Sequence, residues 1–261
     1  MDVVAMVFWR NLISLICISA FLFCRKDFKV LKTARPFAHL GRGLVGTAGI
    51  VATYGAFSYL SISQAVVIFF SASLLAPVLG VIFLKEQVGK YRWAAIIIGF
   101  VGVVIAAQPD ETMQVIGIVV ALAAAFLQGL VNLFLRWLGS TEDAKTTTFY
   151  FFLIATIATG FFLPFVDFIP DPDAVWMVLA LGVGALFAQL SLSHAYRFAE
   201  VSIVSLLNYT ALIWAAMFDL ALWGIIPPVH VFIGGFIIVG SNLFILYREN
   251  RRSRTFSGKA S

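Results

Sequence analysis

The chain has 261 residues, of which 61% are hydrophobic and only 12% are charged. Soluble domains are about 25% charged, and no polar stretch here is long enough to form such a domain, so a separate globular catalytic head is excluded. The net charge of +5 comes from short basic links and a basic tail. Membrane topology and anionic lipid explain that excess, so we expect no nucleic-acid partner.

Apolar stretches of about 20 residues follow one another along the whole chain, with short links between them. Each stretch can cross the ~30 Å hydrocarbon core as a helix that rises about 1.5 Å per residue. In such a core the backbone polar groups must be satisfied within the helices. The sequence predicts an all-α polytopic membrane protein with nine transmembrane helices, at residues 3–24, 38–60, 63–84, 92–108, 115–135, 146–166, 174–195, 199–222 and 228–247.

The basic residues are sorted to one side of these predicted spans. Apart from Arg10, every Lys and Arg falls in or near links on that side, or in the tail from Arg248 onward. The opposite links, at residues 109–111 and 167–173, are acidic and contain no Lys or Arg. The positive-inside rule then predicts a cytoplasmic C-terminus and, with nine crossings, an external Met1.

A weak internal repeat relates the two halves of the chain. Residues 59–102 align with residues 196–240 with one inserted residue, and the pairs Tyr59/Tyr196 and Gly102/Gly240 are identical. The turn inside the first copy is predicted to be cytoplasmic and its counterpart external. The copies therefore have opposite orientations, as in inverted-repeat transporters.

Charged side chains inside the spans need a reason, since each costs about 2.5–3.5 kcal/mol on insertion scales. Arg10 lies about two turns from the external end of its span, where it either snorkels outward or faces a wet cavity as an anion-binding group. Arg42 lies one turn from the cytoplasm, and we interpret it as snorkelling. Asp219, close to an external end, is either a proton or cation site or part of a hydrated helix end, and we favour the hydrated end.

Several uncharged polar side chains also lie within the spans. Any one of them could be a hydrogen-bonding contact between helices. Because amides and phenols come from both halves of the chain, we predict that as a set they line a cavity. The set comprises Tyr54, Gln64, Gln128, Asn132, Gln189, Ser193, Tyr196, Asn208 and Tyr209.

The sequence contains no motif that indicates catalysis or a bound cofactor. It has no Gly-rich phosphate loop, no His-Glu-x-x-His, no Cys pair at metal spacing and no Gly-x-Ser-x-Gly. We therefore predict a protein that is not an enzyme and that uses no metal or cofactor.

Two groups of residues resemble a known family. The first half carries Arg42-Gly43, Leu84-Lys85-Glu86, Gly99 and Pro109. The second half carries Tyr209-Thr210-Ala211-Leu212-Ile213-Trp214-Ala215 and Tyr247-Arg248-Glu249. Nearly the whole chain resembles EamA-type carriers of the drug/metabolite transporter superfamily, and the second group is most similar to the bacterial branch that includes riboflavin and S-adenosylmethionine carriers.

This resemblance implies ten helices in two inverted five-helix repeats around a central cavity. The first repeat would be residues 1–109 and the second residues 110–250, followed by a basic cytoplasmic tail at residues 251–261. The first repeat lacks its opening helix, so we expect an in-frame apolar stretch of about 20 residues upstream of Met1 in the gene. The sequence also departs from the family at Ser73, Asp219 and Gly224, where the family usually has Pro, Gly and Glu.

The resemblance further implies a secondary transporter in the bacterial inner membrane that moves a small organic metabolite by alternating access. A membrane-embedded enzyme and a non-transporting scaffold are the alternatives. Asp219 is a possible coupling residue. The expected substrate-cavity residues are Arg10, Tyr54, Gln128, Asn132, Gln189, Asn208, Tyr209 and Trp214.

Overall fold

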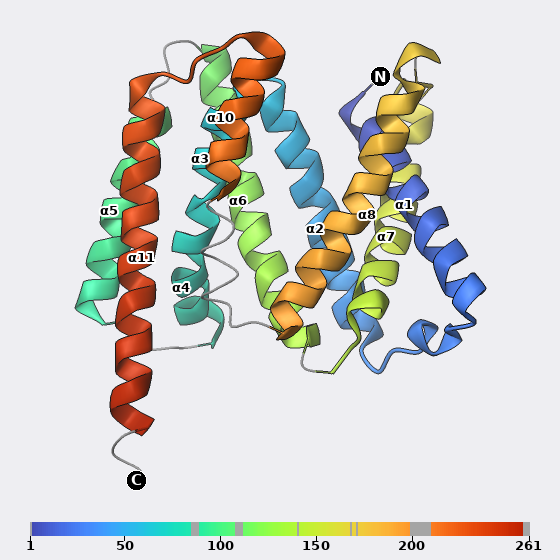
Figure 1. Cartoon of the computed structure of the whole chain (residues 1–261), viewed down its shortest axis with the longest axis horizontal. Coiled ribbons are helices and arrows are strands. Elements are labelled where there is room, and N and C mark those ends of the chain that lie inside the picture. Colours follow the sequence, from blue (N-terminus) through green and yellow to red (C-terminus); the bar gives the residue numbers. More distant parts are fainter. Residues whose placement is uncertain are drawn as a thin grey trace. The chain divides into compact units, whose positions relative to one another are not determined.

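The structure is a computed structural model that describes residues 2–84, 89–107, 112–139, 141–167, 169–170, 172–198 and 210–257. All regular secondary structure in these ranges is helical, which confirms the predicted all-α class (Figure 1). The helices are α1 (Val3–Arg25), η1 (Phe28–Leu31), α2 (Pro36–Phe57), α3 (Ile62–Phe69), α4 (Ser71–Leu84), α5 (Lys90–Ala107), α6 (Thr112–Gly139), α7 (Ala144–Gly160), η2 (Leu163–Phe165), η3 (Pro172–Ala174), α8 (Val175–Phe198), α10 (Thr210–Trp223) and α11 (Val229–Ser257).

Among the residues that the structure describes, four segments are long and apolar enough to cross a membrane: Val3–Arg25, Val115–Gly139, Ala144–Phe165 and Pro172–Ala195. Other helices are apolar but shorter. Many large apolar side chains on these helices are exposed, among them Val104, Phe187 and Phe236. Such exposure would promote aggregation of a soluble protein, whereas in a bilayer these side chains face lipid.

One predicted span is wrong as a single helix. Residues 63–84 form α3 and α4, which are separated at Phe70. The carbonyl oxygen of Phe70 accepts a 2.6 Å hydrogen bond from the hydroxyl of Ser73, a local bond that competes with helix continuation. Pro77 lies within α4, where it has no N–H to donate to the carbonyl of Ser73 and so weakens the first turns of that helix. Of the predicted span 199–222, residues 199–209 lie outside the described residues.

The chain divides into two compact units, each drawing on both halves of the sequence. Unit 1 comprises Met1–Tyr54 and Leu130–Glu200, and in it α1, α7 and α8 pack on one another. Its apolar core includes Ile18, Phe152 and Leu186. Polar caps fix the helix starts: the Asp2 carboxylate accepts from the N–H of Val4, and that of Asp143 accepts from the N–H of Lys145.

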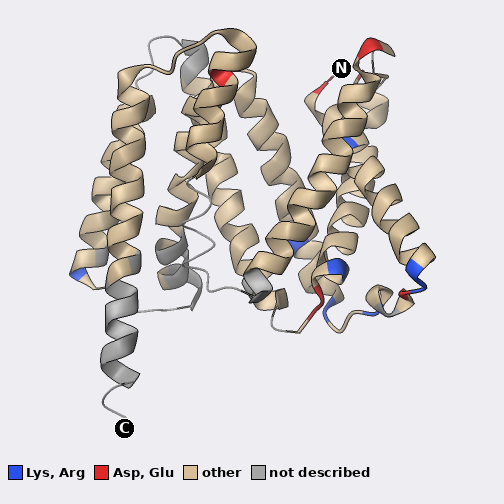
Figure 2. Cartoon of the chain, viewed as in Figure 1, with Lys and Arg blue, Asp and Glu red and all other residues tan. Residues whose placement is uncertain are grey.

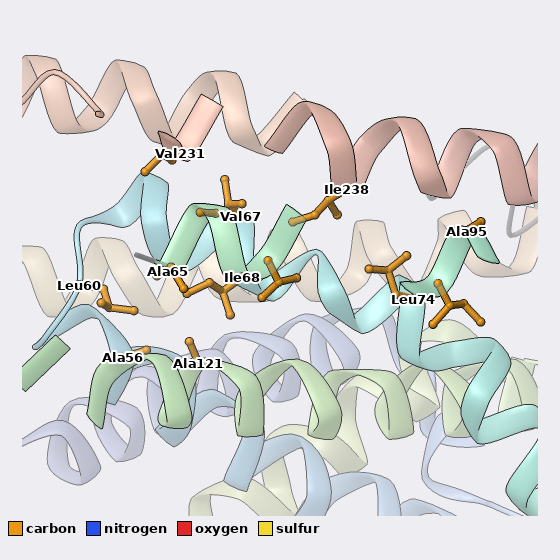
Figure 3. Packing of buried hydrophobic residues seen from close by; sticks show 14 of the residues in the cluster. Ala56, Leu60, Ala65, Val67, Ile68, Leu74, Ala95, Ala121, Val231 and Ile238 are labelled. Atoms are coloured by element: carbon orange, nitrogen blue, oxygen red, sulfur yellow. The ribbon is translucent and has the colours of Figure 1, made fainter. Parts of the chain in front are cut away.

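Unit 2 comprises Gly55–Gly129 and Val201–Ser261. Its core joins side chains of α3, α4, α5 and α11, including Val67 and Ile238 (Figure 3). Helices α5 and α11 lie side by side, and they approach most closely where Gly102 meets Gly234. A Cβ atom added at Gly234 would collide with the carbonyl oxygen of Gly102, so only glycine permits this contact.

Candidate substrate site

A pair of buried polar side chains on α1 forms the centre of the candidate site. Arg10 is 8% exposed and Asn11 is fully buried. The Nη1–H of Arg10 donates to Oδ1 of Asn11 at 2.9 Å, and the guanidinium also shares a hydrogen bond with Tyr54. Nε of Arg10 and Nδ2 of Asn11 have no acceptor among the described residues. The snorkelling alternative for Arg10 is therefore wrong, while its role in substrate binding stays a prediction.

Close packing between α1 and α8 holds this pair in place. The hydroxyl of Ser14 lies 2.6 Å from the carbonyl oxygen of Gly182 and 2.9 Å from that of Arg10, and it can donate to one of them at a time. A Cβ atom at Gly182 would come within 2.6 Å of Ile13, so glycine lets the backbone of α8 lie directly against α1. The helix surface that carries Arg10 is thereby fixed against α8.

The other predicted cavity residues are spread over both units. Gln189 lies half-buried on α8, and its buried Nε2 has no acceptor among the described residues. Asn132 is half-buried on α6 in unit 1, whereas Gln128 on α6 and Trp214 on α10 are exposed and belong to unit 2. The positions predicted at residues 208 and 209 lie outside the described residues. Of the predicted set, the structure brings together Arg10 and Tyr54.

Asp219 does not lie at a hydrated helix end, and that interpretation is wrong. Its side chain is 1% exposed, and its two carboxylate oxygens accept from the backbone N–H groups of Ile62, at 3.1 Å, and Ser63, at 2.8 Å. The hydroxyl of Ser61 accepts from the N–H of Gln64. Together these acceptors satisfy the free N–H groups of the first turn of α3, where a negative charge is favoured.

The snorkelling interpretation of Arg42 is also wrong. Arg42 is 1% exposed, and its guanidinium carbon lies 4.0 Å from the ring centroid of Phe151. Nε and Nη1 have no acceptor among the described residues. One turn earlier, His39 is buried with its ring centroid 4.8 Å from that of Tyr150. Helix α7 therefore covers the Arg42 guanidinium and the His39 imidazole with aromatic rings.

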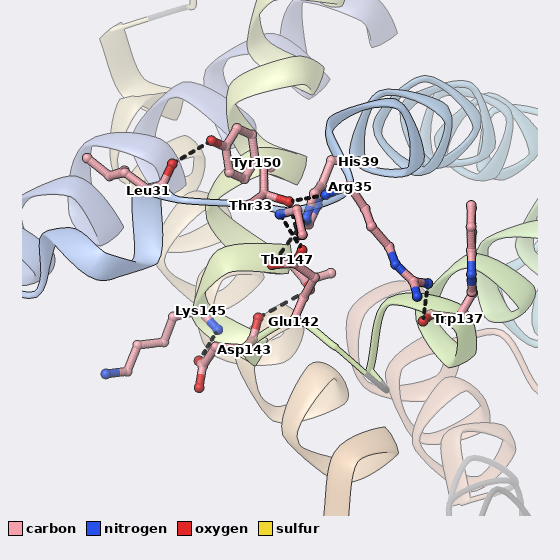
Figure 4. Close-up of polar contacts among 11 residues, drawn as sticks. Leu31, Thr33, Arg35, His39, Trp137, Glu142, Asp143, Lys145, Thr147 and Tyr150 are labelled. Carbon is pink, nitrogen blue, oxygen red and sulfur yellow. Dashed lines mark hydrogen bonds and ion pairs between the residues drawn. The ribbon is translucent and has the colours of Figure 1, made fainter.

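Sequence reasoning missed the polar network that joins the start of α2 to the start of α7 (Figure 4). Oε1 of Glu142 accepts from the hydroxyl of Thr33 at 2.8 Å and from the N–H of Ala34 at 3.1 Å. Oε2 of Glu142 lies 3.9 Å from Nε2 of His39. The hydroxyl of Tyr150 donates to the carbonyl of Leu31 at 2.8 Å. The sequence signal for this network was the acidic pair Glu142-Asp143 directly before α7, because carboxylates at that position favour the start of a helix.

Among the described residues, no group of three or more His, Cys, Asp or Glu side chains could hold a metal ion. The buried donors of unit 1 that lack an acceptor among the described residues can donate hydrogen bonds to a solute, and a guanidinium among them can attract an anion.

Comparison with known proteins identifies the family. The sequence profile of the EamA-like transporter family matches residues 1–108 and 115–247. A riboflavin transporter of Vibrio cholerae is 28% identical over 227 residues, covering 86% of this chain and 76% of the relative. An S-adenosylmethionine uptake transporter of Rickettsia felis is 25% identical over 251 residues, covering 94% and 83%.

A crystal structure of another protein shares the fold at 17% sequence identity. Its TM-score is 0.68, and the match covers 96% of this chain and 89% of that one. Together with the apolar helices, the profile match confirms the resemblance and a multi-pass membrane protein. The chain belongs to the EamA-like transporter family.

Proposed function

We propose that this protein is a secondary transporter that moves a small organic metabolite across the bacterial inner membrane by alternating access. The observation that carries the proposal is a set of buried donors in unit 1 that have no acceptor in the described part of the chain: Nε of Arg10, Nδ2 of Asn11 and Nε2 of Gln189. A polar group left unpaired in the bilayer interior is costly. A polar solute, or the water it displaces, would supply the missing acceptors.

The break between α3 and α4 supports the same function. Secondary transporters commonly build their solute and ion sites from discontinuous membrane helices, because a break frees backbone groups to contact the cargo. The break at Phe70 lies within one predicted span of unit 2. The two relatives named above are bacterial transporters of small metabolites, which supports a small-molecule cargo and an inner-membrane location.

The proposed architecture is the inverted repeat predicted from the sequence, with residues 1–109 and 110–250 as its copies and a cytoplasmic C-terminus. Transport would then proceed by rocking one repeat against the other around a midplane site. The proposed substrate-cavity residues are those of the sequence-based prediction, with Arg10 and Tyr54 in mutual contact.

Cysteine labelling tests the cavity. Gln128, Asn132 and Gln189 are each replaced by Cys in a background from which Cys17 and Cys24 have been removed. We expect the three sites to react with a small polar thiol reagent, and a transported solute to slow that reaction. Phe236→Cys is the matched control: its side chain is 77% exposed on an apolar helix, so it should face lipid and stay inert.

The solute panel for this experiment begins with riboflavin and S-adenosylmethionine, the cargoes named for the relatives. Uniform inertness of the three positions would mean that they are hydrogen-bonding contacts between helices and not a cavity lining. That result would favour the scaffold alternative over the transporter.

A further inference from the structure

A basic groove lies where α1 ends. It has a volume of about 550 Å³ and is lined by Phe21, Arg25, Lys26, Asp27 and Lys145. All five residues belong to unit 1, at the end of α1 and the start of α7, where Figure 2 shows basic residues in blue. The sequence alone attributes the basic excess to membrane topology and to anionic lipid in general, and it predicts no particular binding site.

The groove carries an excess of positive charge. Nζ of Lys145 pairs with Oδ2 of Asp27 at 2.9 Å, which leaves Arg25 and Lys26 without a carboxylate partner among the described residues. The Phe21 ring lies between two cations, with the guanidinium carbon of Arg25 at 5.6 Å and Nζ of Lys145 at 5.9 Å from its centroid. These contacts hold the cationic groups beside the ring.

The surroundings of the groove place it at the edge of a bilayer. Helix α1 is apolar, long enough to span the membrane, and ends at Arg25. The rings of Phe23 and Phe28 meet edge to face with their centroids 6.2 Å apart, and both residues are exposed. Basic residues at the end of a span are typical of the cytoplasmic headgroup region, and the exposed phenylalanine rings beside them can contact acyl chains.

Lys26 occupies a backbone conformation that favours glycine. Its φ is 52°, in the left-handed region, and it is the residue at which α1 ends. Two backbone hydrogen bonds close this helix end. The N–H of Lys26 donates to the carbonyl of Phe23 and that of Asp27 to the carbonyl of Leu22, the pairing of a Schellman motif. Glycine would adopt this conformation with less strain, so replacing Lys26 by Gly removes the charge without harming the helix end.

We propose that this groove binds the phosphate of an anionic phospholipid. Arg25 and Lys26 would contact the phosphate oxygens, and the acyl chains would lie along Phe21 and the exposed Phe23–Phe28 pair. Basic pockets beside membrane helices bind anionic headgroups in this way. The apolar rings favour a lipid over a soluble phosphate, since a soluble ion gains nothing from them.

Native mass spectrometry of the purified full-length chain in detergent tests the proposal. Phosphatidylglycerol should bind more tightly than phosphatidylcholine. Arg25→Gln and Lys26→Gly should each weaken phosphatidylglycerol binding about fivefold and leave phosphatidylcholine binding unchanged. Lys32→Gln is the matched control, because Lys32 is exposed in the same link but does not line the groove, and it should change binding less than about twofold.

The unfolding temperature of Lys26→Gly should equal or exceed that of the native protein. A loss of lipid binding in this variant would then result from the missing charge and not from misfolding. Equal affinity for the two lipids would overturn the proposal. So would an effect of Lys32→Gln as large as that of Arg25→Gln, which would indicate general surface charge. Displacement of the lipid by an equal concentration of glycerol 1-phosphate would show that the groove recognises soluble phosphate, and would overturn the lipid assignment.

Discussion

Replacing Asp219 tests whether its carboxylate stabilises the start of α3. Asp219→Asn keeps the size and shape of the side chain but leaves one acceptor where there were two, so one of the N–H groups of Ile62 and Ser63 loses its partner. An unpaired buried N–H costs about 1–3 kcal/mol, and loss of the negative charge near the helix start removes up to about 2 kcal/mol more. We expect Asp219→Asn to lose about 1–5 kcal/mol and Asp219→Ala, which leaves both N–H groups unpaired, about 2–8 kcal/mol, with Ala the more destabilised of the two.

Equilibrium unfolding in mixed detergent micelles measures these losses. Asp173→Asn is the control, since Asp173 is exposed on η3 and its replacement should change stability little. If Asp219→Asn were as stable as the native protein, or if Asn were worse than Ala, the capping role would be refuted.

The same variant separates capping from proton coupling. If Asp219 couples proton movement to transport, Asp219→Asn should abolish proton-driven accumulation while solute exchange survives, because exchange needs no net proton release. If Asp219 acts as a cap, both activities should fall only in proportion to the amount of folded protein. The second outcome is expected, since both carboxylate oxygens already accept hydrogen bonds from α3.

Three further predictions test packing, the polar network and topology. Gly234→Ala should lower the unfolding temperature, because the added Cβ atom meets the backbone of α5. Gly240→Ala is the control and should be neutral, because no atom lies within 4 Å of the added Cβ atom. Thermal unfolding compares the two variants. Glu142→Ala should lower stability by about 1–3 kcal/mol in the same assay, since it removes the oxygen that accepts from the hydroxyl of Thr33 and the N–H of Ala34 at the start of α2. A reporter fused after Arg252 should report cytoplasm and one inserted at Asp171 the outside; a swapped result would overturn the orientation and the inverted repeat.

The helices were predictable in those segments where the length of the apolar run alone determines the structure. The span predicted at residues 3–24 is α1, Val3–Arg25, because an apolar run of that length has one stable form in lipid. The break at Phe70 was not predictable from the same signal. Residues 63–84 carry no charge and are mostly apolar, and the break is accompanied by a local side-chain hydrogen bond that a hydropathy pattern does not register.

The polar residues were harder to place because their environments come from distant parts of the chain. Arg42 was interpreted from its distance to a helix end, but Phe151 of another helix covers it. Asp219 was interpreted from its position on its own helix, yet its partners lie 156 and 157 residues earlier in the chain. Arg10 was recognised as a candidate because a charge in a span is unusual whatever surrounds it.

Counterflow in sealed proteoliposomes tests the central claim, that the protein is a carrier, most directly. Vesicles are loaded with unlabelled solute, and entry of the labelled solute is measured without ATP or an ion gradient, with riboflavin and S-adenosylmethionine as the first candidates. A carrier that works by alternating access should accumulate label transiently in loaded vesicles and much less in empty ones. Equal uptake by loaded and empty vesicles across the solute panel would contradict the proposed mechanism.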